Sequence, residues 1–329
     1  MRAFSVRAKV RSHAYSLPLE RAITDFGVEE SFVRAAARLK EHYRIEVPPS
    51  AVRAITETHA RQAAEFAIRE PGDKAPLAAQ LIAEMDGSMI PMVRIPEEQA
   101  QGTTDKRKLR KTEWKEARLS VVRVKGSVTS HYGVSFGSTG EAGLSLFQTA
   151  EQAGFGEHTA VHGVGDGAEW IPAQFEEQFG ASASYLLDLY HLCDYLAAAA
   201  PRLLPGNPAL WLENQKQLLK ENRWQEVLNE LEGSLEPEAW PDEQAPARCA
   251  HRYMSRRPEQ LDYAGAIAAE LPVGSGLIES AHRHILQQRL KIAGAWWKPE
   301  NASAIAQLRV LRANNRWNSY WDSHSAQAA

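Results

Sequence analysis

The spacing of hydrophobic residues changes along the chain and divides it into helical and sheet-forming parts. Between residues 17 and 70 apolar positions recur every three to four residues, which predicts helices. From Leu81 onward the pattern predicts a strand that ends at Asp86, a Gly-marked bend and a second extended piece up to Ile95. Further runs rich in Val and aromatic residues predict strands at 118–126, 130–138, 159–168 and 184–191. Helical patterns at 141–154 and 170–180 lie between the later strands. Three strands in a meander, followed by alternating helices and strands, predict an α/β fold with helices packed on a mixed sheet.

The C-terminal half is predicted to be helical. Residues 191–272 contain Pro-punctuated helical patterns without a strand signal, which indicates an all-helical insertion. A turn at 272–276 precedes a helix at 277–291, a last helix is expected at 303–317, and a frayed tail at 324–329. The sequence therefore predicts four regions. They are an N-terminal helical region at 1–75, the first part of the sheet-bearing core at 76–190, the helical insertion at 191–272, and the C-terminal helices of the core at 273–329.

Within the N-terminal region two helices are separated by a short break. The first covers 30–42 and the second follows Ser50, with Val52 and Ile55 directed towards the first. That arrangement leaves Arg53, Thr56, Glu57 and His59 facing outward. A helix-turn-helix, whose second helix enters a DNA major groove, has this pattern, and a generic helical hairpin fits it equally well.

Charge is distributed unevenly. The 329 residues include 38 Lys and Arg against 41 Asp and Glu, and this net charge of −3 argues against a uniformly basic nucleic-acid binder. However, residues 106–125 contain nine basic residues against two acidic ones, and residues 280–317 contain seven against one. Basic flanks around an acidic centre suit a protein that binds phosphates, although each run alone also fits a solvated face.

The sequence also predicts where the protein resides. No apolar run is long enough to span a membrane, and the N-terminus lacks the apolar core of a signal peptide. Two cysteines are too few for a disulfide framework, so a cytoplasmic protein is expected.

Three acidic residues stand at the predicted ends of elements. Asp86 and Asp166 each precede a glycine at a strand end, and Glu279 lies in the first turns of the helix after 272–276. If the two strands are parallel neighbours, Asp86 and Asp166 lie side by side. Clustered carboxylates of this kind select Mg²⁺ or Mn²⁺, and two such ions can promote phosphoryl transfer. Taken singly, Asp-Gly also marks an ordinary turn, and Glu279 fits a helix N-terminal acid.

Four segments give the sequence a specific resemblance. They are MDGSMIP (85–91), VGDGAEWI (164–171), LLDLYHLCDYL (186–196) and GSGLIESAHRHILQQRLKIAGAWWKPENA (274–302). Together with the N-terminal helical leader, they resemble DDE transposases of bacterial insertion sequences, in particular the Kra group related to the Mutator-like superfamily. The resemblance covers most of the chain, from about Leu17 to Trp321, but the zinc-type Cys pairs that some relatives carry near the N-terminus are missing here.

The resemblance implies a ribonuclease-H-like fold and a function. The two Asp lie on adjacent strands and the third acid follows an all-helical insertion, so Asp86, Asp166 and Glu279 become the catalytic residues and the ligands of two Mg²⁺ or Mn²⁺ ions. Asp188 and His191 match a further family pattern, with a supporting role near the active site; a strand-end Asp that caps the next helix is the equal alternative. The implied activity is cleavage and strand transfer of double-stranded DNA at terminal inverted repeats, by at least a homodimer. Expected DNA contacts are Arg53, Thr56, His59, Lys106, Arg107, Lys108, Arg110, Lys111, Arg283, Arg289, Lys291, Trp296 and Trp297.

Other functions remain open at this point. A ribonuclease-H-like nuclease would cut DNA without strand transfer, and a domesticated, inactive transposase would only bind it. A two-carboxylate glycosidase fits poorly, because basic flanks are present and a clustered aromatic sugar platform is not. Cys193 and Cys249, together with His191 and His251, could gather zinc, although their spacing matches no standard finger.

Overall fold

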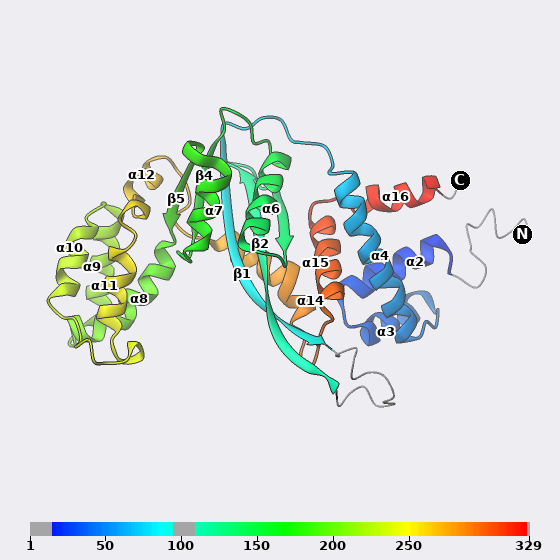
Figure 1. Ribbon diagram of the computed structural model, residues 1–329, viewed down its shortest axis with the longest axis horizontal. Coiled ribbons are helices and arrows are strands. Elements are labelled where there is room, and N and C mark those ends of the chain that lie inside the picture. Colours follow the sequence, from blue (N-terminus) through cyan, green and yellow to red (C-terminus); the bar gives the residue numbers. More distant parts are fainter. Residues whose placement is uncertain (1–14, 95–108, 328–329) are drawn as a thin grey trace, which may run out of the picture.

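The computed structural model describes residues 15–94 and 109–327, which form a central sheet with helices on both faces and at both ends (Figure 1). Its strands are β1 (Gln80–Arg94), β2 (Lys111–Val124), β3 (Ser130–Ser135), β4 (Ala160–Gly165) and β5 (Ala183–Leu187). Its α-helices are α2 (Leu17–Glu29), α3 (Phe32–Tyr43), α4 (Pro49–Arg69), α6 (Thr139–Gln152), α7 (Trp170–Phe179), α8 (Leu189–Leu203), α9 (Pro208–Lys220), α10 (Trp224–Glu232), α11 (Pro246–Ser255), α12 (Tyr263–Ala268), α13 (Gly276–Ala281), α14 (Gln288–Leu290), α15 (Pro299–Ala313) and α16 (Trp317–Gln327). A π-helical turn, His282–Gln287, connects α13 to α14.

The strands form one mixed sheet in the order β3-β2-β1-β4-β5. β1 pairs antiparallel with β2 and β2 antiparallel with β3, which is the predicted meander. β4 and β5 are parallel to β1 and to each other, and each is reached through a helix, α6 or α7. The α/β class and the mixed sheet predicted from the hydrophobic pattern are therefore confirmed.

Alternate residues of β1 face two different cores, as the two-residue repeat of a strand requires. Leu81, Ala83 and Met85 pack with α6 and α7 on one face. Ile90 and Met92 pack on the other face, in a core shared with α4, α13, α15 and α16. Glu84 and Asp86 belong to this second set of β1 positions, so both acids lie on the face that α13 covers.

The predicted helical insertion is formed by α8–α12. Its helices surround a separate core that includes Leu196, Trp211 and Tyr263, and Leu186 and Leu187 of β5 belong to the same core. In Figure 1 these helices lie at one end of the molecule, next to β5. The insertion therefore packs on the parallel edge of the sheet, which β5 forms beside β4.

The N-terminal helices α2, α3 and α4 lie at the opposite end, together with α16 (Figure 1). α2, α3 and α4 enclose a small core around Ile23, Leu39 and Val52. The other side of α4 packs against α15 and α16, where Phe66 contacts Tyr320 with the ring centroids 5.7 Å apart. This region thus has a core of its own and also shares the main core.

Some predicted boundaries were wrong. β1 continues through Asp86 and Gly87 as one strand of 15 residues, because β2 pairs with it along its whole length. The strand expected at 184–191 is β5, which ends at Leu187, and α8 begins at Leu189. Residues 324–327 of the expected tail belong to α16, which buries Tyr320 and Trp321 against α4. In the described part of the chain, no helix combines the length and the apolar character that crossing a membrane requires.

Candidate active site

Asp86 and Asp166 lie on adjacent parallel strands. β1 and β4 pair from Gln80 with Ala160 to Glu84 with Val164, a constant offset of 80 residues. The same offset, continued two residues further, brings Asp86 opposite Asp166 at the point where β4 ends and β1 continues with β2 alone. The spatial relation expected of these two carboxylates is therefore present.

Glu279 reaches the same neighbourhood from α13, where its side chain is exposed. The pKa of Asp86 is raised to about 6, chiefly by burial and also by the nearby carboxylates of Asp166, Glu116 and Glu279, while a hydrogen bond from the Gly87 N–H opposes the shift. Asp166 and Glu279 therefore lie near enough to Asp86 for their charges to act on it. The structure thus brings the three predicted acids into one electrostatic environment.

The acids do not form a complete metal-coordination site in this structure. Oδ1 of Asp86 accepts the Gly87 N–H at 2.6 Å, and Oδ1 of Asp166 accepts the Ala168 N–H at 3.0 Å. Within residues 15–94 and 109–327, no three His, Cys, Asp or Glu are close enough together to hold one ion. This applies also to the cysteines: Cys193 and Cys249 are free thiols, the first of them buried. The carboxylates therefore offer the oxygen donors that Mg²⁺ prefers, with part of their capacity used by backbone N–H groups.

A buried histidine, which the sequence analysis missed, lies against Asp86. Nε2 of His282 is 3.3 Å from Oδ2 of Asp86, and the side chain is 3% exposed. Burial lowers the pKa of His282 to about 4, opposed by the backbone of Asp86, so the imidazole is neutral at pH 7. His282 is three residues beyond Glu279 and begins the π-helical turn; such turns are frequent at functional sites.

A second missed residue, Glu84, supports the helix that carries Glu279. It is 1% exposed, and its Oε2 accepts the N–H of Ile278 at 2.8 Å. Burial raises the pKa of Glu84 to about 8, and hydrogen bonds from the α13 backbone and the charge of Arg123 oppose the shift only in part. Its place two residues before Asp86, on the same face of β1, is the sequence signal that could have identified it.

Asp188 is a structural anchor in this conformation. Oδ1 accepts the N–H groups of Tyr190 and His191 and so caps α8, which was one of the two predicted roles. Oδ2 accepts the N–H of Ser275 at 2.8 Å and also the Ser275 hydroxyl. Asp188 thereby fixes the turn from which α13 begins. The ring of His191 packs edge-to-face with Tyr253.

The helical insertion holds the Asp166 turn. The Tyr253 hydroxyl donates to the carbonyl oxygen of Asp166, and Arg257 donates from Nε and Nη2 to the Gly167 carbonyl at 3.1 and 2.7 Å. Nη1 of Arg257 also donates to the Tyr253 carbonyl at 2.8 Å, and the guanidinium lies 4.5 Å from the Tyr253 ring. Gly167 has a φ of +76°, a conformation that favours glycine and turns the backbone sharply after Asp166.

Several expected DNA contacts are buried, and these predictions were wrong. Thr56 packs against Gly27, while His59 bonds through Nδ1 to the Tyr320 hydroxyl at 2.7 Å and through Nε2 to Glu20 at 3.2 Å. The reason is that α2 and α16 cover the side of α4 that was expected to face solvent. Two further residues, Arg289 and Trp297, are also buried, in the core beneath α3.

The other expected contacts are accessible where the structure describes them. The exposed ones are Arg53, Arg110, Lys111, Arg283, Lys291 and Trp296, whereas Lys106, Arg107 and Lys108 lie outside the described residues. Trp296 packs edge-to-face with Trp114, ring centroids 6.2 Å apart, and remains 43% exposed.

No sequence model of a known protein family matches the chain, and no curated protein matches it. The functional assignment therefore depends on the geometry of the site and on the resemblance of the motifs.

Proposed function

We propose that the protein is a DDE-type DNA transposase, which cuts and rejoins DNA at the ends of an insertion sequence. The observation that supports this proposal is that Asp86 and Asp166 stand on adjacent parallel strands beside α13, the helix that carries Glu279. Two of these acids come from adjacent parallel strands and the third from a helix that follows an all-helical insertion. The motif resemblance implies this order of elements, and a ribonuclease-H-like core is the corresponding proposal for the fold.

The donor set fits Mg²⁺ or Mn²⁺, since it consists of carboxylate oxygens. Asp86, Asp166 and Glu279 would hold two such ions, which supply activation of an attacking oxygen and stabilisation of the leaving one. The backbone N–H groups that now bond to Asp86 and Asp166 fix where those carboxylates lie, and neutral His282 restricts the rotation of Asp86.

The remaining groups of the site position the acids. Glu84 holds the start of α13, Asp188 holds the turn before it, and Arg257 holds the turn after Asp166. Exposed basic residues, including Arg283 within the π-helical turn and Lys291 at the end of α14, are placed to meet the phosphates of a bound duplex. Joining two element ends requires two active sites, so the working complex in this proposal is at least a homodimer.

The test is cleavage of duplex DNA that flanks the gene on either side, with Mg²⁺ or Mn²⁺ added. We expect cleavage and joined products in wild type, and a loss of more than about a hundredfold in Asp166→Asn, because even loss of an outer-shell partner typically costs 10–100-fold. Glu169→Gln, which changes an exposed acid three residues away, is the matched control. Cleavage that survives in Asp166→Asn contradicts the proposal, and cuts without joined products reduce it to a nuclease.

A further inference from the structure

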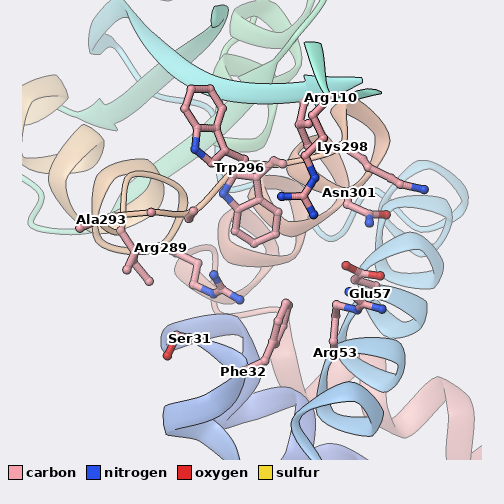
Figure 2. Close-up of a pocket in the computed structure, with 15 residues that line it drawn as sticks. Ser31, Phe32, Arg53, Glu57, Arg110, Arg289, Ala293, Trp296, Lys298 and Asn301 are labelled. Atoms are coloured by element: carbon pink, nitrogen blue, oxygen red, sulfur yellow. The ribbon is translucent and has the colours of Figure 1, made fainter. Parts of the chain in front are cut away.

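A pocket of about 530 Å³ opens between the N-terminal helices and the turn after α14 (Figure 2). Its described walls come from the start of α3, from α4, from the end of β1 and from residues 289–301. Asp86, Asp166 and Glu279 are not among the described residues that line it, so it is separate from the proposed active site. Its volume lies in the range in which proteins hold small molecules.

Arg289 lines this pocket with an unsatisfied hydrogen-bond donor. Its side chain is 2% exposed, and its guanidinium lies between the rings of Phe32 and Trp297, 4.6 and 4.7 Å from their centroids. Nε donates to the Gly27 carbonyl at 3.1 Å, but Nη2 has no acceptor among the described residues. Figure 2 shows the guanidinium directed towards the interior of the pocket. A buried charged donor without an acceptor is costly, and a ligand that supplies an acceptor removes that cost.

The charges around the pocket favour an anion. Arg53 and Arg110 lie on other walls and are exposed, and Figure 2 shows the Arg110 guanidinium directed inward. Lys298 adds a fourth basic residue, against Glu57 as the one acidic residue among the described lining residues. Arginine guanidinium groups match phosphate oxygens in geometry as well as in charge.

The pocket also contains an accessible aromatic surface. Phe32 and Trp297 are in contact with Arg289, whereas Trp296, which also lines the pocket, is 43% exposed. Bases stack on aromatic side chains of this kind irrespective of sequence. The cavity is larger than one phosphate group needs. Because it is concave, with walls from helices, the end of β1 and the turn at 291–298, it does not fit the convex surface of a duplex.

We infer that this pocket binds one unpaired nucleotide, with its phosphate between Arg289, Arg53 and Arg110 and its base against Trp296. The nucleotide can belong to a DNA strand or be free in solution. We assign it to a DNA strand, an assignment that rests on the proposed function, whereas nucleotide binding itself does not.

Binding is measured with the whole protein in EDTA, so that cleavage plays no part. The probes are a fluorescent ten-nucleotide single strand, the same strand with abasic sites, the corresponding duplex, free dAMP and inorganic phosphate. The variants are Arg53→Gln combined with Arg110→Gln, and Trp296→Leu, all at exposed positions. Arg61→Gln, an exposed arginine on the same helix outside the pocket, is the control.

We expect the double arginine variant to weaken single-strand binding at least about tenfold and to reduce its salt dependence by the equivalent of one to two phosphate contacts. Trp296→Leu should weaken binding of the normal strand several-fold and leave the abasic strand unchanged, and Arg61→Gln should match wild type. If free dAMP displaces the fluorescent strand as effectively, per phosphate group, as the unlabelled strand does, the ligand is a free nucleotide. That result overturns the assignment to DNA. Three outcomes overturn the inference. They are a loss of duplex binding equal to that of single-strand binding in these variants, competition by inorganic phosphate equal to that by the strand, and unchanged single-strand binding in both variants. Because no metal is present, each result is independent of whether the protein cuts DNA.

Discussion

Glu84 should make the folded protein less stable as the pH rises, and replacing it by Gln should remove that dependence. The side chain is buried between β1 and α13, and its pKa is raised from 4.5 to about 8. A carboxyl group whose pKa is higher in the folded chain keeps its proton there while the unfolded chain has lost it. Stability therefore falls between pH 4.5 and 8 and stays low above that range.

The magnitude follows from the two pKa values. Each pKa unit between the folded and unfolded chain is worth about 1.4 kcal/mol, so the difference between 8 and 4.5 corresponds to at most about 5 kcal/mol above pH 8, and about 3 kcal/mol at pH 7. Glu84→Gln has nearly the same shape and keeps an oxygen for the Ile278 N–H. Burying the amide of the substituted side chain has a free-energy cost that does not depend on pH. The test therefore compares how steeply the free energy of unfolding changes with pH in the variant and in wild type.

The assay is urea unfolding, followed by circular dichroism, at intervals from pH 4.5 to 8.5. We expect the stability of Glu84→Gln relative to wild type to rise by several kcal/mol across this range. The exposed Glu65→Gln on α4 removes the same charge and should run parallel to wild type. Parallel curves for Glu84→Gln would refute the reasoning, since they would mean that Glu84 ionises in the folded protein as it does in the unfolded chain.

Three further predictions concern the contacts that hold the site and the helices around it. Arg257→Leu should lower the free energy of unfolding by about 1–3 kcal/mol and reduce metal-dependent cleavage, while the exposed neighbour Arg256→Leu leaves both near wild type. Asp188→Ala should cost about 2–4 kcal/mol in urea unfolding, because it removes a helix cap and two buried hydrogen bonds. Tyr320→Phe should cost about 1 kcal/mol, measured by thermal unfolding, by leaving Nδ1 of His59 without its hydrogen-bond partner; an unchanged melting temperature would contradict this.

The sequence was informative where local pattern determines structure. Val-rich runs separated by helical periods predicted the strands β1 and β4, whereas their adjacency, which brings Asp86 near Asp166, was implied only by the motif resemblance. The absence of strand signals after residue 191 predicted the insertion, whose helices are now seen as α8–α12.

The parts that could not be predicted depend on contacts between distant segments. Thr56 and His59 have outward positions relative to α3, and only the docking of α2 and α16 buries them. Glu84 and His282 are perturbed because α13 packs on β1, a contact across almost 200 residues that no local pattern announces. Arg289 was taken as a surface charge, since its position between two aromatic rings depends on where α3 lies.

The packing of α4 against α15 and α16 has a consequence for how the molecule can be divided. A fragment that ends after α4 would leave Phe66 and its neighbours without cover, and a fragment that begins at β1 would strip Tyr320 and Trp321 of their partner. Grafting the first seventy residues alone onto a protein of this build would therefore leave apolar faces of both parts uncovered. A folded chimera would have to carry the two C-terminal helices together with the N-terminal ones, as a single unit assembled from both ends of the chain.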